Sequence, residues 1–225
     1  MREQSDADLQ VIRSMGWRRP SHTLISGRSI LLDLSSNDDD WLKSIDGKHR
    51  YYVRKSAGAA LSWAHGNSAA LRRDLANMTQ TLNVEKGMNL PEWDAQDMES
   101  LDRCMPNAIC ILVGCIESRP VTGCLVLVQG PSALYLSAAT LKEGRGVSAA
   151  YSMFSTLRRI LREQNIRVLD FGGIDPASDT ARGVDHFKRG FGGREMSYLG
   201  EWDWATPSIL RLAANQLIKR RAGGT

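Results

Sequence analysis

Residues 107–140 read NAICILVGCIESRPVTGCLVLVQGPSALYLSAAT, and this stretch decides the fold. Three short apolar runs are separated by the turn residues ESRP and QGP, a pattern that predicts an antiparallel β-meander. The third run leads through KEGRG into a predicted helix over residues 147–164, and a further strand follows in residues 166–172. The apolar residues of that helix recur at helical spacing: Val147, Tyr151, Phe154, Leu157 and Leu161. This order predicts an α/β fold with a mixed, mostly antiparallel central sheet flanked by helices.

The flanking elements extend this order in both directions. We expect a strand in residues 22–34, an acidic helix start in SSNDDD and one helix over residues 41–59 with Leu42, Ile45, His49, Tyr52 and Val53 on one face. A short strand (60–65), two helices (68–86 and 91–104), a late strand (194–204) and a last helix from Pro207 complete the prediction. The predicted organisation is a flexible N-terminal segment, residues 1–15, and a single domain, residues 16–222.

Composition places the chain among ordinary soluble proteins. Apolar residues make up 42% of its 225 residues and charged residues 24%, with a net charge of +4 that permits a polyanionic partner without requiring one. No apolar run approaches the roughly 20 residues of a membrane span, and the N-terminus is too polar for a secretory signal, so we expect a cytoplasmic protein. The four cysteines lack C-x-x-C spacing, which favours buried free thiols over a metal site or disulfides.

The KEGRG turn, residues 142–146, is the first candidate ligand site. Glycines that open a helix present free backbone N–H groups to an anion. In N-acetyltransferases of the GNAT fold, this position holds the pyrophosphate of acetyl-CoA. Gly144 and Gly146 fit that pattern, but Leu141 stands where Gln or Arg is expected. A tight turn without a ligand is an equal interpretation.

The second candidate is the basic helix. Lys43, Arg50 and Arg54 share one stripe, and Lys48 and Lys55 form another. Such a surface suits phosphates or a carboxylate. A solvated helix face explains the same charges, and on charge alone it is the favoured interpretation.

The third candidate is the segment of residues 170–193, DFGGIDPASDTARGVDHFKRGFGG. Gly172 and Gly173 allow a close approach to the backbone. Phe187 and Phe191 share one helix face, and Lys188 lies on another, where an ammonium group is suited to stabilise a developing oxyanion. The alternative is that the two aromatic residues are core anchors and Lys188 is an ordinary surface lysine.

Two separated motifs resemble the Fem family of aminoacyl-tRNA-dependent aminoacyltransferases, which have a GNAT-like fold. Residues 170–193 resemble its C-terminal signature, Asp-Phe-Gly-Gly-Ile followed by Phe-Lys-x-x-Phe-Gly-Gly. KHRYYVRKS, residues 48–56, resembles its Lys-x-Arg-x-x-Ile-Arg-Lys-Ala run. The resemblance extends from about Gly16 to Trp204, and it covers only the second of the two GNAT-like domains that peptidoglycan-acting members have.

The resemblance implies transfer of an aminoacyl group from a charged tRNA to the amine of a peptide, with no cofactor because the donor ester is already activated. It implies a role for Phe187 in lining the channel for the tRNA 3′ end and for Lys188 in meeting negative charge. Asp175 is the first choice to bind or deprotonate the acceptor amine. Further substrate-binding candidates are Lys48, Arg50, Arg54, Asp170, Asp185, Gly172 and Gly173. Candidate tRNA phosphate contacts are Arg158, Arg159, Arg162, Lys219, Arg220 and Arg221.

A one-domain chain favours an acceptor from peptide-antibiotic or other secondary metabolism, free or bound to a carrier protein, with a peptidoglycan precursor as the other choice. Two rival functions remain open at this point. One is a CoA-dependent N-acyltransferase, suggested by Gly144 and Gly146. The other is a non-catalytic RNA-binding module that kept the fold.

Overall fold

The computed structural model describes residues 5–222 except residues 22, 24, 88–92, 176–181 and 207. The chain divides into two compact units. The first comprises Met1–Ile30, Gly173–His186 and Arg194–Thr225, and the second comprises Leu31–Gly172 and Phe187–Gly193. The predicted boundaries, a flexible segment 1–15 and a single domain 16–222, stay a prediction.

Seven strands form one sheet in the order β2-β3-β4-β5-β6-β1-β7. Their bounds are β1 Arg28–Asp33, β2 Ser62–Gly66, β3 Ile109–Ile116, β4 Arg119–Gln129, β5 Ser132–Thr140, β6 Val168–Gly173 and β7 Arg194–Ser197. Strands β2 to β5 pair antiparallel, and β5 pairs with β6 in parallel. The predicted meander and the mixed sheet are therefore confirmed, whereas the late strand predicted for residues 194–204 is wrong in extent, since β7 ends at Ser197.

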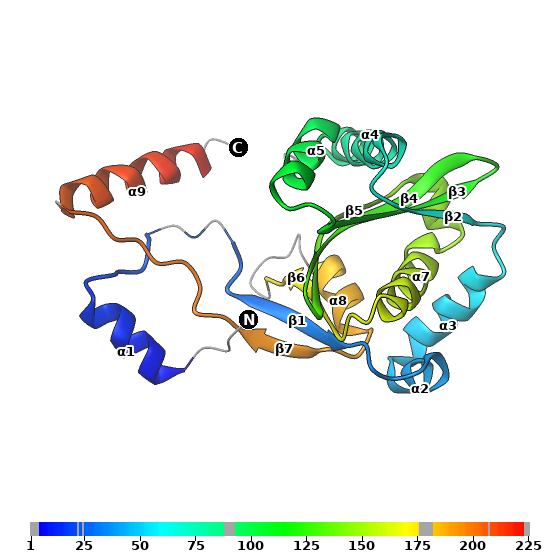
Figure 1. Ribbon diagram of the computed structural model, residues 1–225, viewed down its shortest axis with the longest axis horizontal. Helices are drawn as coiled ribbons and strands as arrows, with labels where there is room; N and C mark the ends of the chain where they lie inside the picture. Colours follow the sequence, from blue (N-terminus) through cyan, green and yellow to red (C-terminus); the bar gives the residue numbers. More distant parts are fainter. Residues whose placement is uncertain are drawn as a thin grey trace. The chain divides into compact units, whose positions relative to one another are not determined.

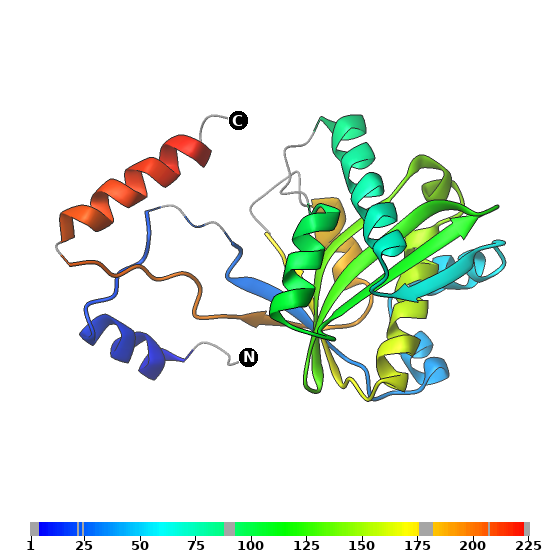
Figure 2. The ribbon, with the colours of Figure 1, turned by 45° about the horizontal axis from the view of Figure 1, so that its top comes forward.

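Helices of the second unit cover both faces of strands β3 to β5. Figures 1 and 2 show α4 and α5 against one face, and α7 against the other. The bounds in this unit are α2 Asp38–Ser44, α3 Gly47–Ala57, α4 Ala69–Lys86, α5 Ala95–Cys104, α6 Lys142–Gly146 and α7 Ala149–Glu163. Helix α8, Arg182–Arg189, has its last residues in this unit. Central strands with helices on both faces need apolar side chains on both faces, and β4 is accordingly buried from Val121 to Leu127.

The single helix predicted over residues 41–59 is wrong, because the chain breaks at Ile45. Ile45 has extended backbone, with ψ of 162°. The carboxylate of Asp46 then accepts the backbone N–H groups of Lys48 and His49 and so begins a second helix. These bonds lower the pKa of Asp46. Gly47 beside the break adds little helix propensity of its own. The acidic helix start predicted in SSNDDD is confirmed, with Asn37 as the N-cap of α2.

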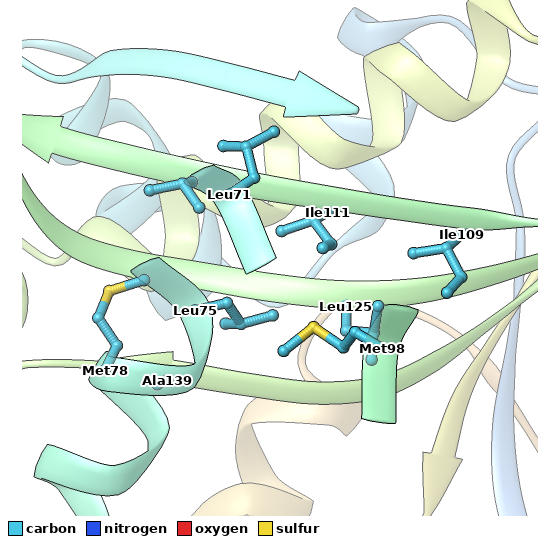
Figure 3. Close-up of a cluster of buried hydrophobic side chains, with 9 residues drawn as sticks. Leu71, Leu75, Met78, Met98, Ile109, Ile111, Leu125 and Ala139 are labelled. Carbon is cyan, nitrogen blue, oxygen red and sulfur yellow. The ribbon is translucent and has the colours of Figure 1, made fainter. Parts of the chain in front are cut away.

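The main hydrophobic core of the second unit lies between α4, α5 and the sheet, as Figure 3 shows. Leu75 and Met98 project from the helices onto the side chains of β3 and β4, among them Ile111 and Leu125, which are fully buried. Burying a side chain of this size contributes about 1.5–3 kcal/mol.

All four cysteines are free. Cys110 and Cys124 are buried, as predicted, and burial raises the pKa of both thiols. Cys115 is half-buried, and Cys104, at the end of α5, is exposed, contrary to the prediction.

The first unit contains α1 (Asp6–Ser14), which lies within the segment predicted to be flexible, and α9 (Ser208–Ala222). Buried Asn215 of α9 accepts the backbone N–H of Ser21 at 2.7 Å and donates to the Asp203 carboxylate at 2.5 Å. The predicted start of this helix, Pro207, lies outside the described residues. Among the described residues, no helix is long and apolar enough to cross a membrane.

The core interpretation makes a stability prediction. We expect Leu125→Ala to lower the free energy of unfolding by about 2–5 kcal/mol, because it removes buried methyl groups and leaves a cavity between α4 and the sheet. Urea denaturation followed by circular dichroism measures this change. The control is Val84→Ala, since Val84 is 79% exposed and its loss is expected to change stability by less than about 0.5 kcal/mol. Equal losses in the two variants would contradict the assignment of this core.

Candidate functional site

The end of strand β6 is where the sequence-predicted residues meet in the second unit. The parallel pairing of β5 and β6 runs from Ser132 with Val168 to Leu134 with Asp170. The carboxylate of buried Asp170 then accepts the backbone N–H of Gly172 at 2.9 Å. Gly172 has a φ of +78°, a left-handed conformation that glycine adopts without strain. The chain therefore turns sharply at the end of the strand.

Lys188 lies beside this turn. A Cβ atom on Gly172 would lie 3.0 Å from the backbone oxygen of Tyr135 and 3.6 Å from Nζ of Lys188. The positive φ and the close Tyr135 oxygen favour glycine at this position, and the Lys188 ammonium group lies near the end of β6. The predicted close approach at Gly172 is present, and Gly172 and Lys188 are brought together.

The two phenylalanines of this segment belong to an aromatic cluster. Phe191 is 1% exposed and packs on Phe154, with ring centroids 4.1 Å apart. Phe187 is half-buried and makes an edge contact with Phe191 at 4.9 Å and with Tyr151 at 5.2 Å. Phe191 is therefore a core anchor, while Phe187 has one part of its surface outside the core.

His49 is the residue of this region for which sequence reasoning gave no functional role. The helical pattern placed it on an apolar face, and it is indeed fully buried. Its Nε2 lies 3.0 Å from the backbone oxygen of Phe187, which precedes Lys188. A Cβ atom on Gly190 would lie only 2.0–2.3 Å from atoms of the imidazole ring, so this position must be glycine. Gly190, two residues after Lys188, is the sequence feature that could have indicated this contact. Its partner His49 lies far away in the sequence, so the pattern alone did not reveal the pair.

The basic helix α3 has an open concavity of about 510 Å³ on its surface, lined by Gly47, Arg50, Tyr51, Arg54 and Lys55. Lys48 and Arg54 are exposed, as a binding surface requires. Arg50 has a structural task as well, because it donates to the backbone oxygens of Lys43 and Ile45, each at 3.1 Å. On the same helix, the Tyr52 ring stacks on Tyr151 with centroids 4.9 Å apart. Burial is the main cause that raises the pKa of Tyr151, and the nearby Tyr52 and Asp46 raise it further.

The other predicted acidic residues and Gly173 belong to the first unit. The buried carboxylate of Asp185 accepts the backbone N–H of Asp175 at 3.0 Å and so fixes the chain at that point. The side chain of Asp175 is exposed. A Cβ atom on Gly173 would lie 3.0 Å from Cβ of Ser26, so packing explains this glycine.

The FemAB family profile matches residues 65–220, more than half of the chain. The chain belongs to the FemAB family. None of the curated proteins matches this sequence. The family membership predicted from the Asp-Phe-Gly-Gly and Phe-Lys motifs is confirmed, and it makes the protein a transferase.

Solved structures show the same fold at low sequence identity. The crystal structure of FemX matches with a TM-score of 0.77 at 15% identity, covering 94% of this chain and 71% of that one. The C-terminal domain of a putative lysylphosphatidylglycerol synthetase from Agrobacterium fabrum matches with a TM-score of 0.63, and L-PGS from Bacillus licheniformis with 0.60. Both are 14% identical to this FemAB protein and cover 96% of it and 71% of their own chains. The predicted GNAT-like α/β fold is confirmed.

The prediction that Arg158 contacts tRNA phosphates is wrong. Arg158 is 1% exposed, and its guanidinium donates to the carboxylate of Asp38 and to the backbone oxygens of Ser36 and Asn37. It also lies 4.9 Å from the ring centroid of Trp41. Burial lowers the pKa of Arg158, and the Asp38 carboxylate opposes that shift. This arginine therefore ties α7 to the start of α2.

The other predicted phosphate contacts differ among themselves. Arg159, the next residue on α7, is exposed. Arg162 is half-buried and forms an ion pair with Asp38 at 3.2 Å. The side chains of Lys219, Arg220 and Arg221 lie outside the described residues.

The KEGRG turn forms the short helix α6, and packing explains one of its two glycines. A Cβ atom on Gly144 would lie 2.5 Å from the backbone oxygen of Val121 on β4, so only glycine fits. A Cβ atom on Gly146 would have no neighbouring atom within 4 Å, so packing does not explain this glycine. The pattern that suggested a pyrophosphate site is thus half explained by contact with the sheet.

The burial of Arg158 makes a prediction. We expect Arg158→Ala to lower the free energy of unfolding by about 3 kcal/mol, near the low end for breaking a buried pair, because the remaining Asp38 side chain is 60% exposed and stays hydrated. The control Arg159→Ala changes an exposed residue of the same helix and is expected to cost less than about 0.5 kcal/mol. Chemical denaturation of both variants tests this. A variant at 158 as stable as the wild type would contradict the anchoring role.

Proposed function

We propose that this FemAB family member is an aminoacyl-tRNA-dependent aminoacyltransferase that forms an amide bond on a peptide amine. The observation that carries the proposal is the position of Lys188, whose ammonium group lies beside the turn at Gly172. The family match over residues 65–220 supports the class of reaction. Lys188 follows a half-buried aromatic residue, Phe187, in the motif that resembles the Fem signature.

In the proposed reaction the neutral acceptor amine attacks the ester carbonyl carbon of the charged tRNA. A C–N bond forms, and the carbonyl electron pair moves onto oxygen. When this tetrahedral intermediate collapses, the ester C–O bond breaks, and the ribose oxygen of the tRNA leaves and takes up the proton that the amine loses. The ammonium group of Lys188 stabilises the oxyanion and the leaving oxygen. Because the donor ester is already activated, we propose no cofactor.

The acceptor amine needs a group that orients it and removes its proton. Asp175 is proposed for this task because its side chain is exposed while its backbone is held by Asp185. Buried Asp170 is instead assigned to holding the turn at Gly172.

The tRNA is proposed to contact the surface of α3. The concavity there presents the cations Arg50, Arg54 and Lys55 to phosphates, and Tyr51, which is 59% exposed, offers a ring on which an unpaired base can stack. Exposed Lys48 and Arg159 are further candidate phosphate contacts.

For the acceptor we propose a peptidyl amine from peptide-antibiotic or other secondary metabolism, or else a peptidoglycan precursor. The structural neighbours named FemX and putative lysylphosphatidylglycerol synthetase carry different names on the same fold, so the fold alone does not select the acceptor. CoA-dependent N-acylation has less support than its motif suggested, because contact with Val121 already accounts for Gly144.

The proposal predicts a large loss of activity in Lys188→Ala. We expect transfer from a pool of radiolabelled aminoacyl-tRNAs to peptidyl amines of both classes to fall by about 10²–10³-fold, as when one group that stabilises an oxyanion is removed. The release of label from tRNA into an amide-linked product measures this rate. The matched control is Lys86→Ala, since Lys86 is an exposed lysine at the end of α4 and should keep wild-type activity.

A parallel reaction with acetyl-CoA and the same amines separates the rival enzyme class. Acetyl transfer without any aminoacyl transfer would overturn the proposal, and so would a Lys188→Ala variant as active as the wild type. Binding of aminoacyl-tRNA with no transfer to any amine would favour the RNA-binding module instead.

A further inference from the structure

The last turn of helix α8 has a backbone oxygen bonded by a distant side chain. The final carbonyl groups of a helix lack intrahelical donors. Here the N–H of Phe191 bonds to the oxygen of Lys188 at 3.4 Å, and that of Gly192 bonds to the oxygen of Arg189 at 3.1 Å. The oxygen of Phe187 lies 3.0 Å from Nε2 of His49, 138 residues earlier in the chain. Because a carbonyl oxygen only accepts, Nε2 carries the hydrogen in this contact.

A second hydrogen bond ties the other side of Lys188 to the same helix start. The backbone N–H of Asp46, the N-cap of α3, donates to the oxygen of Gly190 at 3.0 Å. The two bonds hold the carbonyls one residue before and two residues after Lys188. The backbone that carries the Lys188 side chain is therefore fixed from both directions by residues 46 and 49.

The imidazole of His49 is itself held in place. Phe191 contacts its ring nearly perpendicularly with centroids 4.9 Å apart, and Tyr151 makes an edge contact with it at 5.2 Å. The Asp46 carboxylate lies 3.5 Å from Nδ1. Gly190 lies against the ring, where a Cβ atom would overlap it. This fit leaves the ring no room to swing away from the Phe187 carbonyl.

We propose that His49 is a positioning residue for Lys188, which it places through the hydrogen bond to the Phe187 carbonyl. This inference rests on the function proposed above for Lys188. A displacement of about 1 Å of a reacting group can slow a reaction about 10²-fold. The contribution of His49 is therefore expected in kcat, since it sets the geometry of the lysine rather than contacting the substrate.

Two substitutions separate the hydrogen bond from the packing of the ring. His49→Gln keeps an N–H donor at a similar distance from the backbone, and His49→Phe keeps an aromatic ring but has no donor. We expect kcat of aminoacyl transfer to fall about 10²-fold in His49→Phe with KM changed less than about threefold, and to recover at least tenfold in His49→Gln. His65→Phe, at an exposed histidine on β2, is the control for introducing the new side chain.

A second measurement does not depend on activity. Brief labelling with acetic anhydride, followed by mass spectrometry of peptides, reports the reactivity of the Lys188 amine relative to that of exposed Lys86. We expect this ratio to change more than about threefold in His49→Phe and to stay near the wild-type value in His49→Gln, because only the former frees the lysine backbone. If the phenylalanine variant does not fold, His49→Met, which also lacks a donor, takes its place.

The two readouts keep the two proposals apart. If the wild type transfers nothing from tRNA but the labelling ratio changes as expected, the proposed function fails and the positioning role of His49 stands. If the glutamine and phenylalanine variants lose activity and melting temperature equally, the ring serves packing alone, and the positioning role is overturned. An unchanged kcat and labelling ratio in His49→Phe overturns it as well.

Discussion

The left-handed backbone at Gly172 is the constraint around which the candidate site is organised. Glycine adopts a φ of +78° freely, and the Asp170 carboxylate holds the turn by accepting the Gly172 N–H. The preceding residues, Leu169 to Phe171, are buried, so the end of β6 cannot shift without disturbing the core. A Cβ atom at this position would lie only 3.0 Å from the Tyr135 backbone oxygen, and the Lys188 ammonium group lies beside the same residue. Core packing, backbone conformation and the proposed chemistry thus depend on one residue.

The start of α3 provides the second fixed point, and it exists because the chain breaks at Ile45. Asp46 caps the new helix with its carboxylate, and its own N–H is turned toward the oxygen of Gly190. In a continuous helix through this region, the Asp46 N–H would donate to a carbonyl of the same helix and could not reach Gly190. The same break places His49 in the first turn of α3, where its ring meets Gly190. The capping of one helix and the placement of the lysine on another therefore share the same residues.

The glycines and arginines show why residue type alone misleads about binding. Gly144 lies in a turn predicted to bind a ligand and Gly190 in the candidate segment of residues 170–193, but each is a point where a side chain would overlap β4 or an imidazole ring. Arg158 and Arg159 are neighbours with the same charge. A rotation of about 100° per residue on α7 turns the first into the core against Trp41 and Asp38 and the second into solvent. Their sequence signals are the same, and their roles are opposite.

The sequence by itself determined the order of the strands and the long helices between residues 60 and 173, the antiparallel meander, the acidic start of α2 and the family signature around Lys188. Turns, caps and apolar periodicity act over a few residues, which is why these features can be read locally. Only the tertiary structure decided the break at Ile45, the burial of Arg158 and the pairing of His49 with Phe187. Those features depend on contacts between residues more than 100 positions apart, or on which face of a helix the sheet covers. Local patterns cannot encode such contacts, because their partners come together only when the core packs.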